Sequence, residues 1–215
     1  MSDSVIVNEI YATLQGEGAR SGRACVIVRL TGCNLRCDWC DSTYAREEGT
    51  EMPISEVLEA VKEFGPNMVL VTGGEPLCQS SAPALLRRLC EAGHEVLLET
   101  NGSMDITMVD ERVARCVDVK CPGSGQAGSF LESNFAALAA GDEVKFVLAD
   151  RADYEYAREV IAARGLTERC EVILSPVTAQ LAPAALAEWI LADGLDVRLG
   201  LQLHKIIWPG RDRGV

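Results

Sequence analysis

The sequence has little positive charge and no long apolar run, and both absences exclude classes of partner. Lysine and arginine number 20 against 32 aspartates and glutamates, which gives a formal net charge of -12. An acidic surface repels phosphate backbones and anionic lipids, so we expect no nucleic-acid partner and no membrane partner. No apolar run approaches the roughly 18 residues that span a bilayer. Residues 1–9 also lack the basic and apolar regions of a secretory signal.

Histidine is scarce, whereas cysteine is not. The two histidines, His94 and His204, are isolated, but there are nine cysteines. An odd number of unevenly spaced cysteines does not suit a disulfide framework. In a chain without a secretory signal, such cysteines more often bind metal or take part in catalysis in a reducing compartment. We therefore expect a cytoplasmic protein.

The alternation of apolar runs and helical stripes predicts the fold class. At 215 residues the chain suits one core, and we expect a single domain over residues 1–215. Strands are predicted at Cys25–Leu30, Met68–Thr72, Glu95–Thr100, Cys116–Lys120, Glu143–Leu148, Glu171–Leu174 and Val197–Leu203. Helices are predicted at Pro53–Phe64, Pro83–Ala92, Asp105–Arg115, Ala152–Arg164 and Thr178–Leu191. This order indicates an α/β fold, an incomplete (partial) β/α barrel whose chemistry gathers at the carboxyl ends of its strands.

Three cysteines with tight spacing follow the first of these strands. Cys33, Cys37 and Cys40 are separated by three and then two residues. Thiolate sulfur is the usual ligand of iron–sulfur clusters, and three ligands leave one iron of a [4Fe–4S] cluster open for chemistry. The alternative is a structural zinc site, which needs four ligands. No second close Cys pair or Cys–His pair is present to complete one.

This spacing, with Trp39 just before the last cysteine, resembles the signature of the radical S-adenosylmethionine (SAM) superfamily. The resemblance implies a partial β/α barrel of the radical SAM type. It implies that the open iron binds the methionine end of SAM, and that an electron from the cluster cleaves the sulfonium to a 5′-deoxyadenosyl radical.

Polar motifs follow several predicted strands. Gly74 and Glu75 belong to a Gly-Gly-Glu-Pro run, in which a Gly-Gly pair alone would indicate a turn. Glu99 and Asn101 end an apolar strand and suit a ribose, although Asn101-Gly102 equally suits a cap or turn.

Asp118 and Lys120 end another strand, where charges are costly unless paired, and a surface Asp–Lys pair is the alternative. Ser175 follows the predicted strand Glu171–Leu174, in the least specific of these motifs. The superfamily resemblance assigns a set of positions to the binding of SAM. They are Trp39, Asp41, Gly74, Glu75, Glu99, Asn101, Asp118, Lys120 and Ser175.

The N-terminal segment narrows the choice among radical enzymes. Leu-Gln-Gly-Glu-Gly at residues 14–18 places an amide and a carboxylate between glycines. A hairpin turn would explain the glycines but not Gln15 and Glu17 together. With Gln-Leu-His-Lys at residues 202–205, the chain resembles the 7-carboxy-7-deazaguanine synthase family over essentially its whole length.

That resemblance implies a lyase of queuosine and 7-deazapurine biosynthesis. It would convert 6-carboxy-5,6,7,8-tetrahydropterin to 7-carboxy-7-deazaguanine and ammonia by hydrogen abstraction at C6 and ring contraction, using SAM catalytically. The positions assigned to substrate binding are Leu14, Gln15, Gly16, Glu17, Arg29, Thr72 and His204. The planar donors of Arg29 match a carboxylate. A satisfied core histidine is the alternative for His204.

The family also implies Mg²⁺ near the substrate, with Ser42 at the metal position, because hydroxyl oxygen suits a hard cation. An electron donor such as flavodoxin or ferredoxin and a homodimer are further implications. One rival is a glycyl-radical-enzyme activase, which would not need a polar small-molecule pocket. Another is an electron-transfer or zinc module, which would not need polar motifs after most strands. The six residues after Pro209 form a tail beyond the end of some compact family members.

Overall fold

The computed structural model describes residues 3–211 and 213–215. Within them one sheet has nine strands in the order β3-β1-β2-β4-β5-β6-β7-β8-β9. The strands are β1 Ser4–Leu14, β2 Ala24–Leu30, β3 Thr50–Pro53, β4 Met68–Gly73, β5 Glu95–Thr100, β6 Ala114–Asp118, β7 Glu143–Leu148, β8 Glu171–Pro176 and β9 Arg198–Leu199. Strands β2 and β4 to β9 run parallel, and β1 pairs antiparallel with both β2 and β3. The sheet has two ends and does not close, which confirms the predicted partial β/α barrel.

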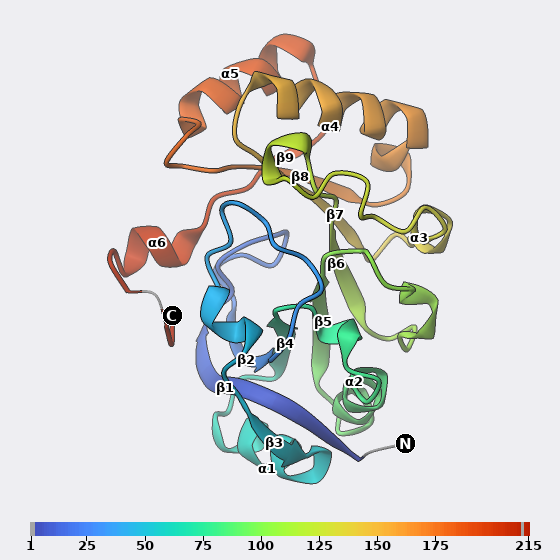
Figure 1. Cartoon of the computed structure of the whole chain (residues 1–215), viewed down its shortest axis with the longest axis vertical. Helices are drawn as coiled ribbons and strands as arrows, with labels where there is room; N and C mark the ends of the chain where they lie inside the picture. The colour runs from blue at the N-terminus through green and yellow to red at the C-terminus, as the bar shows by residue number, and fades with distance from the viewer. Residues whose placement is uncertain (1–2, 212) are drawn as a thin grey trace.

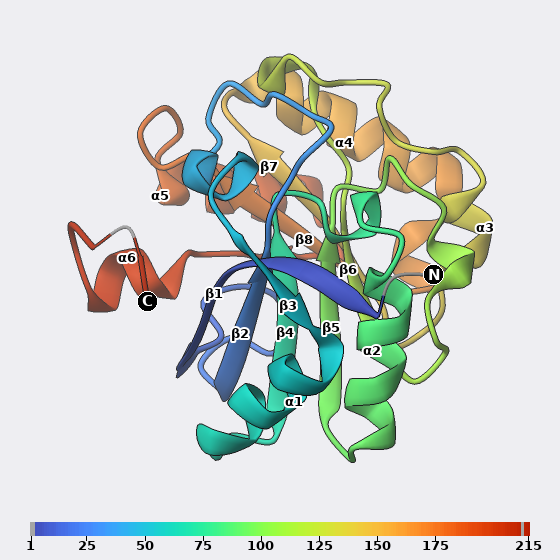
Figure 2. The ribbon, with the colours of Figure 1, turned by 60° about the horizontal axis from the view of Figure 1, so that its bottom comes forward.

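The helices are α1 Ile54–Glu63, α2 Ala82–Glu91, α3 Asn134–Ala137, α4 Arg151–Arg164, α5 Pro183–Asp193 and α6 Leu203–Ile207. On the outer face of the sheet, α1 and α2 lie near β3 to β5, and α4 and α5 lie near β7 to β9, whereas α6 lies apart from them (Figures 1 and 2). Helix α4 shows how local sequence fixes an element. The Asp150 carboxylate accepts a hydrogen bond from Asp153 N–H at its start, and Gly165 ends it at a φ of 56°.

Alternation along the strands divides the sheet into an outer and an inner face. The outer face belongs to the large core shared with the helices. The inner face carries a small apolar cluster of Cys25, Ile27, Met68, Leu70, Leu97 and Cys116. Two residues further along their strands, Thr72, Glu99 and Asp118 continue the inner rows with polar groups. The inner face is therefore apolar towards the amino ends of the strands and polar towards their carboxyl ends.

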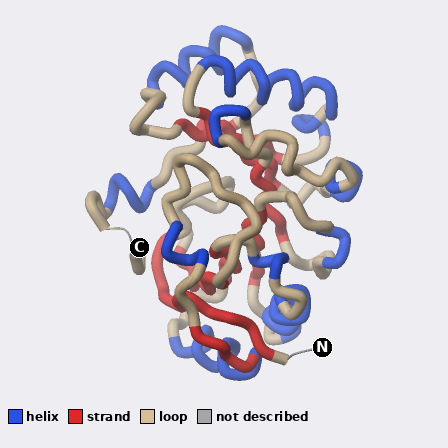
Figure 3. The backbone as a smooth tube through the Cα atoms, in the orientation of Figure 1, coloured by secondary structure: helices blue, strands red, loops and turns tan. Residues whose placement is uncertain are grey.

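Residues 15–23, which we call the plug loop, connect β1 to β2 and cross the inner face. The Arg20 guanidinium lies 2.7 Å from the Glu143 carboxylate on β7, and Ala19 N–H donates to the same carboxylate at 3.0 Å. Arg23 bonds Glu95 on β5 at 2.6 Å. These contacts hold the plug loop across the amino ends of the parallel strands. Loops also gather over the middle of the molecule in Figure 3, with helices around them.

Two predicted elements are wrong. In place of a helix over Asp105–Arg115 there is a short 3-10 turn at Ile106–Met108, and β6 already begins at Ala114. The apolar residues that suggested a helical stripe are buried, but Asp105 and Asp110 accept hydrogen bonds from backbone N–H groups two residues on. Such bonds favour turns over helix.

The predicted strand Val197–Leu203 is reduced to Arg198–Leu199, and Leu203 begins α6 instead. The chain leaves the sheet at Gly200, whose N–H still donates to Leu174 O, and crosses to the plug loop, where Leu203 N–H donates to Gly16 O at 2.9 Å. The strand therefore ends because its next backbone donors bond elsewhere. In addition, the predicted helix at Thr178–Leu191 begins only at Pro183.

The longest helix, α4, has 14 residues. Across residues 3–211 and 213–215, no helix combines the length and the apolar character that crossing a membrane requires.

Candidate active site

A cavity of about 660 Å³ opens at the carboxyl ends of the parallel strands. Its walls come from the inner rows of β2 and β4 to β8, the cysteine loop, the plug loop and the segment from Gln202 onwards. Apart from Glu75, all the residues predicted to bind metal, SAM or substrate line this cavity. The structure therefore brings together side chains that are up to about 190 positions apart in the sequence.

The loop after β2 carries Cys33, Cys37 and Cys40, which are half-buried and line the cavity. Backbone bonds hold this loop, with Asp38 N–H donating to Ser124 O at 3.1 Å. Leu35 N–H points at Cys33 Sγ at 3.4 Å. Amide donors aimed at sulfur stabilise the thiolates of iron–sulfur clusters, so this loop fits a cluster held by three cysteines.

All nine cysteines are free thiols. Among the described residues, no group of three or more His, Cys, Asp or Glu side chains is arranged to hold a single metal ion.

The glycine pair after β4 is required by backbone packing. A Cβ on Gly73 would lie 2.0 Å from Leu30 O, and one on Gly74 would lie 2.1 Å from Gly32 O and 2.9 Å from Cys33 Cβ. The close approach allows Gly74 N–H to donate to Leu30 O at 3.1 Å. The pair thus fixes the end of β4 against the start of the cysteine loop, which a side chain would push away.

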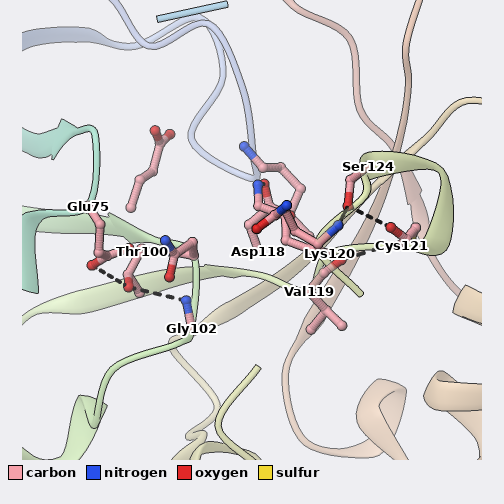
Figure 4. A network of polar contacts seen from close by, with 12 residues as sticks. Glu75, Thr100, Gly102, Asp118, Val119, Lys120, Cys121 and Ser124 are labelled. Carbon is pink, nitrogen blue, oxygen red and sulfur yellow. Dashed lines mark hydrogen bonds and ion pairs between the residues drawn. The ribbon is translucent and has the colours of Figure 1, made fainter. Parts of the chain in front are cut away.

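Glu75 lies behind the cavity wall and is fully buried. Its carboxylate accepts hydrogen bonds from the Asn101 backbone N–H at 2.6 Å and from Leu77 N–H at 2.9 Å. It also accepts one from the Thr100 hydroxyl at 2.8 Å (Figure 4). Burial raises the pKa of Glu75 in spite of these donors. In this structure the carboxylate therefore holds the turn after β5 and does not face the cavity.

The Asp118–Lys120 pair after β6 lies inside the cavity (Figure 4). The two side chains are 14% and 16% exposed and lie 2.7 Å apart, so the surface-pair alternative is wrong. Burial lowers the pKa of Lys120, but the Asp118 carboxylate outweighs it and raises that pKa overall. Asp118 Oδ1 is buried and has no hydrogen-bond partner within the described residues. An unpaired buried acceptor in a cavity wall suits a ligand that donates.

Glu99 links two groups of predicted residues. Its carboxylate accepts from the Thr72 hydroxyl at 3.0 Å and from Gln15 Nε2 at 3.4 Å, so it meets residues assigned to the substrate. Asn101 combines its two alternative roles. Its side chain caps a turn by accepting from Ser103 N–H at 2.9 Å, and it also lines the cavity.

Arg29 is held by two residues that the sequence did not single out. Its Nε donates to Glu9 at 2.7 Å and an Nη to the Tyr11 hydroxyl at 3.1 Å. Glu9 also accepts from the Tyr44 hydroxyl, whose pKa burial raises to about 12. The antiparallel pairing of Glu9 with Arg29 across β1 and β2 explains the contact, and recognising β1 as a strand would have predicted it.

Lys145 is a further residue that the sequence analysis did not single out. It lies on β7, lines the cavity and donates to Glu17 at 3.0 Å. The signal was present in the sequence as two charges, Glu143 and Lys145, two residues apart in an otherwise apolar strand. Charges spaced in this way point to one face.

The C-terminal segment completes the wall. Gln202 Nε2 donates to Glu17 at 2.8 Å and to Asp41 at 3.1 Å, and Asp41 also accepts from the Ser42 hydroxyl. His204 lies in the cavity wall with its ring against Gly16, where a Cβ would come within 2.5 Å of Nδ1. The side chain is only partly buried and faces the cavity, so the core-histidine alternative is wrong.

The tail after Pro209 also returns to the cavity, where Gly210, Arg211 and Val215 contribute to the lining. The Tyr11 hydroxyl donates to Val215 O at 3.0 Å, and Arg213 bonds Glu48. Asp212 of this tail lies outside the described residues.

The chain is similar in sequence to proteins of known family. Residues 27–122 match the model of the radical SAM superfamily. The chain is 45% identical to the 7-carboxy-7-deazaguanine synthase of Koribacter versatilis, covering 97% of this chain and 99% of that protein. It is also 45% identical to the synthase of the same name from Chlorobaculum tepidum, covering 97% and 96%.

Solved structures are similar in fold. QueE from Escherichia coli superposes with a TM-score of 0.79 at 22% identity, over 93% of this chain and 94% of that one. Streptococcus suis SuiB bound to S-adenosylmethionine gives a TM-score of 0.55 at 12% identity, over 79% of this chain and 44% of that one. At these identities the likeness concerns the fold alone.

Proposed function

Because this chain belongs to the 7-carboxy-7-deazaguanine synthase family of radical SAM enzymes, we propose that it converts 6-carboxy-5,6,7,8-tetrahydropterin to 7-carboxy-7-deazaguanine with loss of ammonia. The observation that carries the proposal is a single cavity lined both by the three-cysteine loop and by Gln15, Glu17 and Arg29. In that cavity the three cysteines would hold the group that supplies the radical, and the plug-loop residues would hold a small molecule within the same space.

Cys33, Cys37 and Cys40 would hold the [4Fe–4S] cluster, which when bound supplies the electron that cleaves SAM to a 5′-deoxyadenosyl radical. Hydrogen abstraction from C6 of the pterin, ring contraction and return of the hydrogen would make SAM a catalytic cofactor. The residues proposed to face SAM are Trp39, Asp41, Gly74, Glu99, Asn101, Asp118, Lys120 and Ser175, with Glu75 acting from behind the wall by holding Asn101.

On the substrate side, Arg29 offers an anion-binding fork already oriented by Glu9 and Tyr11. Such orientation lowers the entropy lost when a carboxylate binds. Glu17 and Gln15 offer acceptors and donors to the pyrimidine edge of the pterin. Leu14 and Gly16 line the cavity beside them, and Thr72 and His204 complete this side.

Mg²⁺ is part of the proposal, with Ser42 supplying a hard hydroxyl oxygen and waters completing the shell. The ion would neutralise charge on the substrate carboxylate. We further propose that residues 1–215 act as a single domain in a cytoplasmic homodimer reduced by flavodoxin or ferredoxin, in the queuosine pathway. The free thiols support a reducing compartment.

The decisive experiment is anaerobic reconstitution with iron and sulfide, followed by reduction and addition of SAM, Mg²⁺ and 6-carboxy-5,6,7,8-tetrahydropterin. Mass spectrometry should detect 7-carboxy-7-deazaguanine over many turnovers while SAM persists. Accumulation of 5′-deoxyadenosine without the deazaguanine would contradict the proposed substrate and favour an activase that acts on a protein.

A further inference from the structure

Lys145 is a buried cation in the cavity wall to which the proposed function gives no role. Its side chain is 11% exposed and leaves β7 on the inner face, whereas its neighbours Val144 and Phe146 are fully buried in the outer core. Its Nζ lies 3.0 Å from Glu17 Oε2. A lysine is rarely buried unless it is paired, so the burial of Lys145 beside Glu17 requires an explanation.

The β7 strand anchors the plug loop at two points with different surroundings. Glu143 binds Arg20 and Ala19, and it does not belong to the cavity lining that the structure describes. Lys145 binds Glu17 inside the cavity. The Glu143 contacts already fix the loop in place, so the Lys145 contact is not required as an anchor. Its effect is on the charge of Glu17.

The groups that face Glu17 explain why that charge needs support. Asp41 on the cysteine loop repels it, while Lys205 on α6 lies nearer to Asp41, at 3.7 Å. Burial alone would raise the pKa of Glu17, but the Lys145 ammonium and the Gln202 hydrogen bond lower it overall.

Lys145 in turn is faced by acidic groups from two further strands, Glu99 on β5 and Cys116 and Asp118 on β6. On the other side of the plug loop, His204 of α6 lies against Gly16. Of the cations among these groups, Lys145 is the one bonded directly to Glu17. Removing its charge would leave a partly buried carboxylate, 18% exposed, beside Asp41, and both conditions favour the protonated form.

We propose that Lys145 is a positioning residue that makes the cavity selective for a 2-amino-4-oxopyrimidine edge by keeping Glu17 an anion. This inference rests on the proposed function, since it concerns how the same cavity reads a pterin. The pterin edge presents two adjacent donors, N3–H and the 2-amino group, and each carboxylate oxygen keeps a lone pair beyond its bond to Lys145 or Gln202.

The selectivity follows from the pattern of donors and acceptors. A lumazine carries a carbonyl in place of the 2-amino group, so an anionic Glu17 meets an acceptor there and repels it. A protonated Glu17 offers one donor and one acceptor, which matches the N3–H and the 2-carbonyl of the lumazine but leaves one donor of the pterin edge without an acceptor. The charge of Glu17 therefore decides between the two ligands.

The test is equilibrium dialysis of 6-carboxypterin and 6-carboxylumazine against the cluster-loaded protein with SAM, without turnover. The wild type should prefer the pterin by about thirtyfold, with a ratio that stays flat between about pH 6 and about pH 7.5. In Lys145→Gln the preference should fall to about threefold or less near pH 7 and rise with pH, because Glu17 then titrates. Lys145→Arg should retain most of the preference.

The matched control is Arg20→Met, which removes the other anchor of the plug loop outside the cavity. It should lower the melting temperature but leave the pterin-to-lumazine ratio unchanged. Equal loss of the ratio in Arg20→Met and Lys145→Gln would overturn the proposal, since the loop position and not the charge would then decide. A preserved, pH-independent ratio in Lys145→Gln would also overturn it.

Lys145→Met provides a second neutral variant if the Lys145→Gln protein does not fold, as judged by circular dichroism and cluster absorbance. It should lose the preference in the same way. Failure of the wild type to bind 6-carboxypterin at all would overturn the proposed function together with this inference. Tight pterin binding by wild type with no discrimination against the lumazine would overturn the inference alone.

Discussion

The carboxylate of Glu75 accepts the backbone N–H of Asn101 at 2.6 Å, across the gap between the end of β4 and the end of β5. Through this contact a residue that does not touch the cavity fixes one that does. The contact also explains how a Gly-Gly-Glu-Pro run can shape a site whose carboxylate is buried.

Replacing Glu75 with alanine should destabilise the fold by about 3 kcal/mol, because three donors lose their acceptor in a buried site. Urea unfolding of the protein before cluster reconstitution measures this. Glu75→Gln keeps one acceptor oxygen and should cost less. A loss below about 1 kcal/mol in the alanine variant would show that the turn after β5 does not depend on Glu75.

Replacing Cys37 with alanine should abolish cluster binding, because two thiolates cannot hold a [4Fe–4S] cluster that needs three. Visible absorbance and iron content after anaerobic reconstitution provide the measurement. The matched control is Cys78→Ala, since Cys78 is an exposed thiol outside the cavity lining. Retained cluster absorbance in the Cys37 variant would remove that residue from the ligand set.

Replacing Arg29 with alanine should weaken binding of 6-carboxypterin by roughly 2–4 kcal/mol, because the carboxylate of the pterin loses a charged, bidentate partner. Binding of SAM, measured in the same dialysis, should be unchanged. Arg23→Ala is a suitable control, because Arg23 bonds Glu95 at the opposite end of the strands. Unchanged pterin affinity in the Arg29 variant would place the substrate carboxylate elsewhere.

The contacts of Glu95 with Arg23 and Arg20 should give the plug-loop anchor a dependence on pH. Hydrogen bonding to Arg23 lowers the pKa of Glu95 in the folded protein. A carboxylate with a lowered pKa stabilises the fold above its unfolded pKa of about 4.3, and the contribution disappears as pH falls through the lower folded value.

Glu95→Gln should therefore reduce the melting temperature at neutral pH and have no effect in strong acid. The difference at neutral pH should correspond to less than about 1 kcal/mol, because the side chain is 38% exposed and solvent screens the pairs. Thermal unfolding of both proteins across the acid range is the measurement. A difference that persists below about pH 3 would assign the effect to packing and not to charge.

The sequence predicted the parallel core of the fold well, because buried strands are continuous apolar runs and these occur at β2, β4, β5, β7 and β8. It failed where local periodicity and tertiary contacts disagree. Asp105–Arg115 has helical spacing, yet its two aspartates accept hydrogen bonds from backbone N–H groups two residues on, which favours turns. Residues 200–203 look like a strand, but beyond Gly200 the chain leaves β8, and Leu203 N–H bonds the plug loop instead.

Site residues in motifs were predictable because each motif follows a strand, and parallel strands end at one edge. Lys145 and Glu9 belong to no motif and lie inside strands. Their importance depends on which face of the strand points inwards and on which strand lies opposite. A periodicity argument does not contain that information until the strand order is known.

The plug loop has a consequence for how this kind of active site can change over evolution. Leu14 to Glu17 form one short contiguous stretch, whereas the side chains proposed for SAM come from the separate ends of four strands and the cysteine loop. Exchange of this single hairpin would thus alter the recognition of the ligand, while the residues proposed to bind the cluster and SAM stay unchanged. The rest of the substrate side comes from β2, β4, β7 and α6, so such an exchange would change one part of the substrate preference and leave these contacts in place.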